Sequence, residues 1–177
     1  MIEGQETKVM SVRDAIIEAM SEEMRRDENV FLIGEDVGVY GGDFGTSVGM
    51  LEEFGSERVR DTPISENAIS GCAVGAALTG MRPIVDVTFM DFIVYMMDNI
   101  VNQAAKTRYM YGGKGSVPVV FRCAAGSGLC SAAQHSQSLE AWFCHIPGLK
   151  VVAPGTPADV KGILKAAIRD NNPVIFL

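Results

Sequence analysis

Apolar residues follow two different spacings along this chain. After Ser11, which with Asp14 resembles a capping box, apolar residues recur at helical spacing as far as Met24, and the polar residues 27–29 interrupt them. Short uninterrupted apolar runs, by contrast, are typical of strands that are buried on both faces of a sheet. The pattern predicts strands at about residues 30–33, 58–60, 83–88, 117–121, 149–152 and 173–177.

Helices are predicted between these strands. A short helix ends at Gly55, and a helix of small apolar residues ends at Gly80, which can adopt a left-handed conformation. Thr156 as N-cap and Pro157 at the first helical position start the last helix. The predicted ranges are 48–54, 68–78, 92–109 and 157–169. Because strands alternate with helices, we expect an α/β fold with three αβα layers and a mostly parallel sheet of about six strands.

Length and composition favour a single domain over residues 1–177. The net charge of −7, with no cluster of Lys or Arg, argues against nucleic-acid binding. Residues 1–8 contain no apolar stretch and predict no signal peptide, while the run 69–81 is too short and too rich in glycine to cross a bilayer. The four cysteines lack zinc-binding spacing, which favours a soluble protein of the reducing cytoplasm.

Candidate chemical groups follow the predicted strands. Glu35 comes after the first strand, residues 61–66 after the second, Asp91 after the third, and the loop that contains His135 after the fourth. In a parallel α/β sheet, ligands bind beyond the carboxyl ends of the strands. We therefore expect these groups to converge at one edge of the sheet.

Each candidate also has a simpler structural explanation. A carboxylate at a helix start, such as Glu66, is favoured by the helix dipole, and a histidine in a polar loop, such as His135, is more often structural than catalytic. Phe92 and Tyr95 are three positions apart on one helix face, where aromatic residues usually belong to the core. The glycines within residues 126–131 do not complete a dinucleotide-binding motif, so a Rossmann site is disfavoured.

Four segments of the chain favour functional roles for these candidates over the structural explanations. They are DTPISE (61–66), AAQHSQ (132–137), HIPGLKVV (145–152) and IRDNNPV (168–174). In this order they closely resemble the β subunits of thiamine diphosphate-dependent 2-oxo acid dehydrogenases, which include the pyruvate and branched-chain enzymes and the related acetoin dehydrogenase. The resemblance runs from about Val9 to the end of the chain and implies the pyrimidine-binding domain of the transketolase-like fold.

The resemblance implies roles for individual residues. Glu66 matches the glutamate that hydrogen-bonds N1′ of the cofactor's aminopyrimidine and favours its imino tautomer, whose nitrogen removes the thiazolium C2 proton. His135 matches the histidine that faces the substrate and the lipoyl group. Glu35 resembles an acidic residue proposed to relay protons between the two sites of the tetramer. The implied catalytic residues are Glu66 and His135, and the implied cofactor-binding residues are Glu35, Ile64, Glu66, Phe92 and Tyr95.

Metals and partners are implied in the same way. Mg²⁺ and the diphosphate belong to the family's α subunit, and residues 42–45 do not fit its Gly-Asp-Gly motif. The expected partners are that α subunit in an α2β2 heterotetramer, a lipoyl acyltransferase component and a second β subunit. Because the family's β subunit has a further C-terminal domain and this chain stops inside a predicted strand, we expect a part of a longer polypeptide. A potassium ion is implied at Val119, Ala167, Ile168, Asp170 and Asn172.

Three functions remain open from the sequence. The leading hypothesis is a catalytic β-subunit domain that acts on pyruvate or a related 2-oxo acid and passes the acyl group to a lipoyl arm. An acetoin dehydrogenase would use the same cofactor and acceptor but would cleave a hydroxyketone, so activity on pyruvate against acetoin distinguishes the two. A non-catalytic assembly module is disfavoured because both Glu66 and His135 are present.

Overall fold

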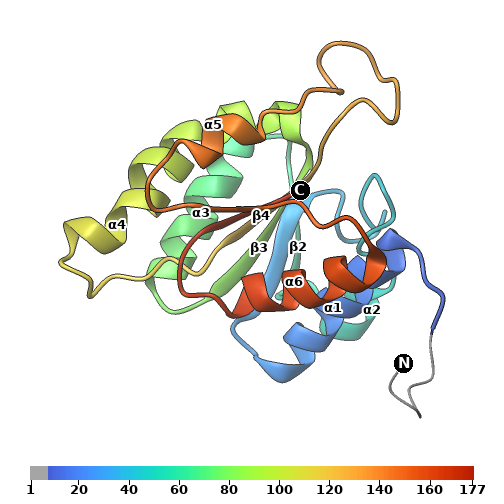
Figure 1. The fold of residues 1–177 in the computed structure, drawn as a ribbon. Coiled ribbons are helices and arrows are strands. Elements are labelled where there is room, and N and C mark those ends of the chain that lie inside the picture. Colours follow the sequence, from blue (N-terminus) through green and yellow to red (C-terminus); the bar gives the residue numbers. More distant parts are fainter. Residues whose placement is uncertain (1–7) are drawn as a thin grey trace, which may run out of the picture.

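A parallel sheet with helices on both faces forms three layers (Figure 1). The computed structural model describes residues 8–177, so the predicted absence of a signal peptide falls largely on residues 1–7, outside the described residues. The strands are β1 (Val30–Glu35), β2 (Val59–Thr62), β3 (Arg82–Phe89), β4 (Val120–Ala124), β5 (Lys150–Val152) and β6 (Val174–Phe176). The helices are α1 (Val12–Arg26), α2 (Met50–Phe54), α3 (Glu66–Leu78), η1 (Met90–Met96), η2 (Asp98–Ala104), α4 (Ala105–Met110), α5 (Glu140–Cys144) and α6 (Pro157–Arg169).

The strand order determines where a ligand can bind. The sheet has six strands in the order β2-β1-β3-β4-β6-β5, and every neighbouring pair is parallel. Helices α1, α2 and α6 cover one face, while α3, α4 and α5 cover the other (Figure 1). The predicted three-layer α/β fold is therefore confirmed. Because β2 and β3 lie on opposite sides of β1, the crevice beyond the carboxyl ends of β1 and β3 is the expected ligand position.

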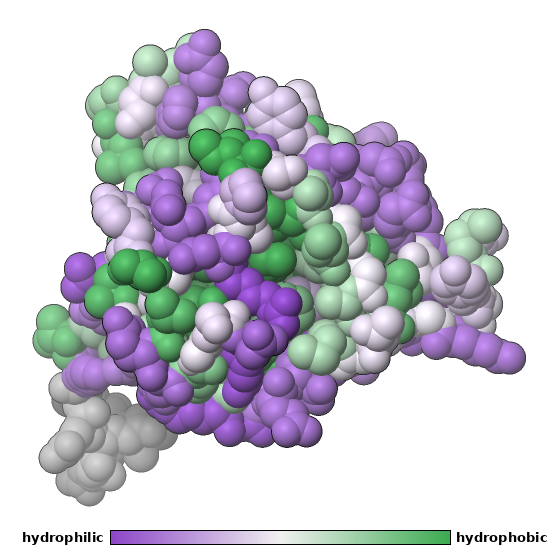
Figure 2. All heavy atoms as spheres, turned by 180° about the vertical axis from the view of Figure 1, so that it is seen from behind, coloured by the Kyte–Doolittle hydropathy of each residue, from purple (hydrophilic) through white to green (hydrophobic). Residues whose placement is uncertain are grey.

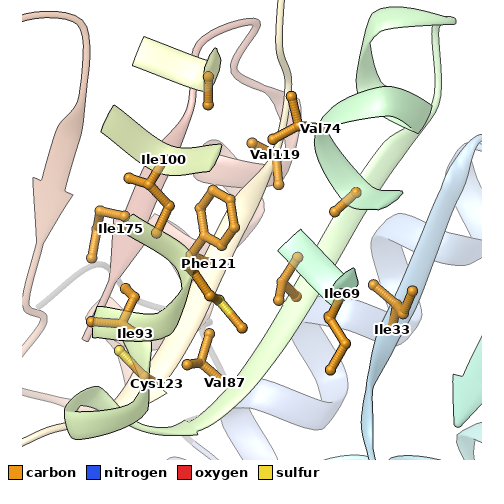
Figure 3. Packing of buried hydrophobic residues seen from close by; sticks show 14 of the residues in the cluster. Ile33, Ile69, Val74, Val87, Ile93, Ile100, Val119, Phe121, Cys123 and Ile175 are labelled. Carbon is orange, nitrogen blue, oxygen red and sulfur yellow. The ribbon is translucent and has the colours of Figure 1, made fainter. Parts of the chain in front are cut away.

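Two hydrophobic cores stabilise the sheet, one on each face. In β4, Phe121 belongs to the core under α3, whereas its neighbour Val120 belongs to the core under α1 and α6. Figure 3 shows Phe121 in the middle of the first core, with Ile69 of α3 and Ile100 of η2 around it. Successive side chains of a strand point to opposite faces, so a strand covered on both sides needs an uninterrupted apolar run.

The helix ends are set by local hydrogen bonds that the sequence predicts. The Asp14 backbone N–H donates to Ser11 Oγ at 3.1 Å and caps α1, and the N–H of Asp159 donates to Thr156 Oγ1 at 3.2 Å and caps α6. Gly80, just after α3, has a φ of 101°, the left-handed conformation expected there. These capping predictions are confirmed.

The continuous helix predicted over residues 92–109 is wrong. The chain forms a 3₁₀-helix (η1), a π-helix (η2) and then the short α4. The buried residues Ile93, Met96, Ile100 and Ala104 are spaced by three, four and four positions. This spacing is also that of a regular helix with 3.6 residues per turn, so the apolar pattern predicts the buried face but not the change to 3₁₀ and π turns.

Smaller differences concern strand ends and a short helix. Strand β4 starts at Val120, three residues later than predicted, because the Val119 N–H donates to Val117 O at 2.9 Å and closes a local turn. Helix α5 was not among the predicted helices, and His145 is its C-cap residue. None of the helices within residues 8–177 is long and apolar enough to span a membrane.

Candidate functional site

Two carboxylates meet beyond the ends of β1 and β2. Glu35 is the last residue of β1 and is aligned with Thr62, the last residue of β2. After Thr62 the chain turns at once into α3, whose first residue is Glu66. Both glutamates are half-buried. The sheet therefore brings together two acidic side chains that are 31 positions apart in the sequence.

The environment of Glu35 favours a protonated carboxyl group. Burial raises the pKa of Glu35, and the negative charge of Glu66 raises it further, against the opposing effect of the Ser65 backbone N–H. Its Oε1 is buried without a hydrogen-bond partner within the described residues. A buried polar atom without a partner is costly, so this oxygen is available to a ligand or to a shared proton.

The first turn of α3 is held in place by η2. Asn99 Nδ2 lies within hydrogen-bond distance of Asn67 O at 3.0 Å, Asn67 Oδ1 at 2.9 Å and Ser70 Oγ at 2.9 Å. Ser65, the N-cap of α3, makes no side-chain cap. Asn99 donates and therefore does not act as a cap, but its hydrogen bonds attach the first turn of α3, where Glu66 lies, to η2.

An aromatic cluster surrounds His135. The ring centroid of His135 lies 4.9 Å from that of Phe89 and 5.2 Å from that of Phe92, and both pairs are edge-to-face. Phe44, from the glycine-rich loop after β1, contacts Phe89 in the same manner at 5.3 Å. Such contacts stabilise the rings in one arrangement and present a flat apolar surface at the carboxyl edge.

The loop that carries His135 is attached to η1. The side-chain Nε2 of Gln137 donates to Asp91 Oδ1 at 2.8 Å, and the Leu139 N–H lies 3.2 Å from Met90 Sδ. In Figure 1 this loop, drawn in orange, projects beyond the end of the sheet. A cavity of about 200 Å³ lies beside His135 and Phe89, lined otherwise by Ala124 at the end of β4 and by residues of the loop that follows it, among them Leu129. His135 therefore borders a small cavity, and the Ser136 hydroxyl next to it is buried without a partner in the described chain.

The predicted convergence at one edge is confirmed for most of the candidates. Glu35 lies beside Glu66, and Phe92 lies beside His135, which makes two groups at the carboxyl edge. Ile64 and Tyr95 are mainly exposed, with 82% and 64% of their surface accessible, so the core position that is usual for such an aromatic residue does not apply to Tyr95. Both side chains are available to a ligand or a second subunit.

The residues implied for potassium lie at the opposite, amino edge. Arg82 Nη1 donates to Ile168 O at 3.0 Å and to Asp170 O at 3.1 Å. The Val119 carbonyl accepts from the Val174 N–H at 2.9 Å. The pKa of Asp170 is lowered, since hydrogen bonds from Lys150 and Asn172 outweigh the opposing effect of burial.

The donor set for the predicted potassium ion already bonds to positive side chains, since Arg82 donates to two of its carbonyls and Lys150 pairs with the Asp170 carboxylate. The set consists of backbone carbonyls and one anionic carboxylate, and each carbonyl has a second lone pair beyond the one that its hydrogen bond uses. Within residues 8–177, no group of three or more His, Cys, Asp or Glu side chains could hold a metal ion.

One feature near the site was absent from the sequence predictions. Asp86 in β3 and Arg122 in β4 form a buried ion pair, and Thr46 of the glycine-rich loop joins it. A signal for it existed, because each charge interrupts an otherwise apolar strand run. A charge inside a central strand needs a partner of opposite charge.

Comparison with known families agrees with this geometry. Residues 8–177 match the family described as "Transketolase, pyrimidine binding domain". The chain belongs to this family.

Several curated relatives are similar over almost the whole pyrimidine-binding domain. The chain is 55% identical to the pyruvate dehydrogenase E1 component subunit beta of Rhizobium meliloti, over 98% of this chain and 38% of that protein. It is 53% identical to the 2-oxoisovalerate dehydrogenase subunit beta of Bacillus subtilis, over 95% of this chain and 51% of that protein. It is 51% identical to the beta subunit of acetoin:2,6-dichlorophenolindophenol oxidoreductase of the same organism, over 96% and 53%. The chain thus spans about half or less of these relatives.

A solved structure supports the fold. A protein described as "Split gene transketolase, inactive beta4 tetramer" matches with a TM-score of 0.72 and 21% sequence identity, over 96% of this chain and 51% of that one. At this identity the match concerns the fold of the pyrimidine-binding domain.

Proposed function

We propose that this pyrimidine-binding domain belongs to the β subunit of a thiamine diphosphate-dependent 2-oxo acid dehydrogenase of the pyruvate type. The observation that carries the proposal is the pair of half-buried carboxylates at the carboxyl edge, Glu35 and Glu66, with a buried oxygen of Glu35 lacking a partner. High identity to pyruvate and 2-oxoisovalerate dehydrogenase β subunits supports the same assignment.

The cofactor, when bound, supplies a thiazolium carbon nucleophile and an electron sink for decarboxylation. Glu66 is the residue that we assign to the aminopyrimidine, where its carboxyl group shares a proton with the N1′ position. The raised pKa of Glu35 makes this neighbour a suitable proton store, because it retains a proton at a pH at which an ordinary glutamate is ionised. Ile64, Phe92 and Tyr95 are the side chains that we assign to the rim around the pyrimidine.

His135 is assigned to the substrate side of the site. It borders the cavity of about 200 Å³ and is supported by Phe89 and Phe92. From this place its imidazole can donate a proton or a hydrogen bond to an oxygen on which negative charge develops, and it can meet an incoming lipoyl group.

The domain supplies only part of such a site. We assign Mg²⁺ and the diphosphate ligands to an α subunit, a potassium ion to the oxygen cluster around Asp170, and acyl transfer to a lipoyl acyltransferase. Apolar side chains exposed on this domain suit an α2β2 assembly with β–β contact; they include Ile64, Leu78, Tyr95, Tyr109 and Trp142. Figure 2 shows hydrophobic residues gathered in the middle of one face between hydrophilic ones, as expected of a partner-binding surface.

An acetoin dehydrogenase β subunit is the second candidate, favoured by the 51% identity to the Bacillus subtilis acetoin oxidoreductase subunit. A non-catalytic assembly module is the least favoured function. The cytoplasm is our proposed compartment, supported by four free cysteines, although relatives described as mitochondrial also match.

The test is co-expression of the full-length β subunit with its α partner and an activity screen over pyruvate, branched-chain 2-oxo acids and acetoin. We expect the highest kcat/KM with pyruvate or another 2-oxo acid, dependent on thiamine diphosphate and Mg²⁺. A preference for acetoin would select the second candidate. Absence of activity on every substrate, in an assembled enzyme that binds the cofactor, would select the assembly module.

A further inference from the structure

A buried ion pair lies within the sheet below the His135 cluster. Asp86 of β3 and Arg122 of β4 are direct neighbours in the register and are only 7% and 5% exposed. Arg122 Nη2 is hydrogen-bonded to Asp86 Oδ2 and donates to Thr46 Oγ1 at 2.7 Å. A buried ion pair of this kind need not stabilise the fold, since the desolvation of both charges offsets their attraction. Its position below the His135 cluster is consistent with a role in the site.

Asp86 also holds a β-bulge. Its Oδ1 accepts the backbone N–H of Thr88 at 3.1 Å, and Thr88 has a φ of 61°. A β-branched residue rarely adopts this left-handed conformation, so the surroundings must impose it. The hydrogen bond to Asp86 Oδ1, two residues earlier in the same strand, stabilises this conformation of Thr88.

The bulge changes the face to which Phe89 points. Asp86 pairs with Arg122, but Phe89 pairs with Ala124, so β3 has one residue more than β4 between these pairs. Arg122 and Ala124 share a face of β4, and Phe89 therefore lies on the face of Asp86. Without the extra residue, Phe89 would point to the opposite face of the sheet.

The same ion pair fixes the other side of Phe89. Thr46, which bonds to Arg122, lies two residues after Phe44 in the glycine-rich loop, and Phe44 packs against Phe89. Phe89 is thus held from its own strand through Asp86 and from the loop through Thr46. Its ring is the one closest to His135, with 4.9 Å between centroids.

We propose that the network of Asp86, Arg122 and Thr46 is a positioning device for His135. It acts through Phe89, whose orientation depends on the bulge and on the glycine-rich loop, and it does not itself touch the substrate. The kinetic part of the test rests on the proposed function, whereas its crystallographic part does not.

Thr46→Val in the full-length β subunit, assembled with the α partner, is the main test. Valine keeps the shape of threonine but removes the hydroxyl that joins Arg122 to the loop. We expect a crystal structure to show Phe44 and Phe89 displaced and the His135 ring disordered or rotated. Turnover should fall roughly tenfold, the size of effect that a small misplacement of a catalytic group produces, while cofactor affinity stays within about twofold.

Two matched variants separate positioning from stability. Thr46→Ser keeps the hydroxyl and should restore both the ring positions and turnover. Thr107→Val removes an equally buried hydroxyl, which donates to Gln103 O in another part of the fold, and should leave turnover unchanged. If Thr46→Val does not assemble, Arg122→Lys keeps the charge on a shorter side chain, which does not place its ammonium where Nη2 bonds to Thr46, and the same displacement is expected.

The proposal is overturned if Phe89 and His135 keep their places and turnover is normal in Thr46→Val or, where that variant fails to assemble, in Arg122→Lys. It is also overturned if Thr107→Val lowers turnover as much as Thr46→Val does. If the unmodified enzyme has no activity on any 2-oxo acid or acetoin, the proposed function fails. The ring positions in the crystal structures then decide the inference alone.

Discussion

The two edges of the sheet are built in opposite ways. Toward the carboxyl edge, the described residues leave four buried side-chain atoms without a hydrogen-bond partner: Glu35 Oε1, Thr62 Oγ1, Arg122 Nε and Ser136 Oγ. The residues other than glycine with positive φ lie toward this edge too, and they are Asp36, Thr88, Cys130 and Ala132. Both features cost free energy, and they coincide with the candidate site.

At the amino edge, arginine side chains satisfy the backbone instead. Arg58 Nη2 donates to the carbonyls of Met24 and Asp27 at 2.8 Å each, and Arg58 Nε donates to the Val30 carbonyl at 3.0 Å. Arg82 donates to two carbonyls before β6 and to Asn171 Oδ1. A planar guanidinium with several N–H donors suits the convergent carbonyls at strand starts and helix ends.

The two edges therefore have different roles, one in stability and the other in ligand binding. The amino edge stabilises the fold with nearly complete hydrogen bonding, so the carboxyl edge can keep strained backbone and unpaired polar atoms for a ligand. Substitutions at the carboxyl edge should therefore change activity, and substitutions at the amino edge should change stability. Four predictions test this separation.

Glu66→Gln at the carboxyl edge has the largest expected effect. In the assembled enzyme, activity should fall by roughly 10²–10⁴-fold, because an amide cannot exchange the proton that the glutamate shares with the aminopyrimidine. Steady-state turnover and thermal unfolding are the measurements, and the unfolding midpoint should hardly change. Glu52→Gln, on the exposed part of α2, is the matched control. Near-normal turnover with the cofactor bound would remove Glu66 from the mechanism.

His135→Ala should impair acyl transfer to the lipoyl group by about 10²-fold, at the lower end of the range for a general acid. Cofactor affinity should change little, because the substitution leaves in place Glu66 and Phe92, the residues that we assign to the aminopyrimidine. Single-turnover acyl transfer and a cofactor titration measure the two effects separately. A large loss of affinity with unchanged transfer would give His135 a structural role.

Arg58→Met at the amino edge should have the opposite profile. Removal of its guanidinium leaves half-buried carbonyls without a donor and should lower the free energy of unfolding by roughly 2 kcal/mol. Turnover per folded enzyme should be unchanged. Arg60→Met is the matched control, since Arg60 is exposed and contacts its neighbour Glu57, through an ion pair and the Glu57 carbonyl, and the Phe31 ring. Each of these exposed contacts contributes less than about 1 kcal/mol. Equal destabilisation by both substitutions would contradict the assigned role of Arg58.

The smallest expected effect is a difference in pH dependence. Glu35 has a raised pKa, so the folded state binds more protons than the unfolded state, and its contribution to stability decreases as the pH rises above about 4.5. Asp27 has a lowered pKa, caused mainly by the Asn29 backbone N–H, so its contribution is present above about 3.8 and is lost as the pH falls.

Thermal unfolding of Glu35→Gln and Asp27→Asn against pH measures both contributions. At pH 7, Glu35→Gln should be slightly more stable than the unsubstituted protein, and the gain should vanish toward acid pH. Asp27→Asn should be less stable at pH 7, and the loss should vanish toward acid pH. The same sign for both variants would show that the two edges do not differ in this respect.

Much of the fold can be predicted from the sequence because it depends on local rules. Ser11 and Thr156 cap helices through hydrogen bonds to residues three positions away. A short continuous apolar run is typical of a strand whose sheet is covered on both faces, so the strands can also be read from the sequence. The candidate site was predictable in outline for a similar reason. In any parallel sheet the carboxyl ends share an edge, so polar residues after strands, such as Glu35 and Glu66, have to meet there.

The remaining features depend on contacts between distant residues. The sequence by itself determined the strands, the helix caps and the chemical groups of the site. Only the tertiary structure decided that η1 and η2 depart from a regular helix, that β3 bulges at Thr88, and that Asp86 pairs with Arg122. Each of these departures costs free energy locally. They persist because they are stabilised by packing against the sheet or by the ion pair between Asp86 and Arg122, which are 36 positions apart in the sequence. The local conformational preferences of the residues do not predict such long-range contacts.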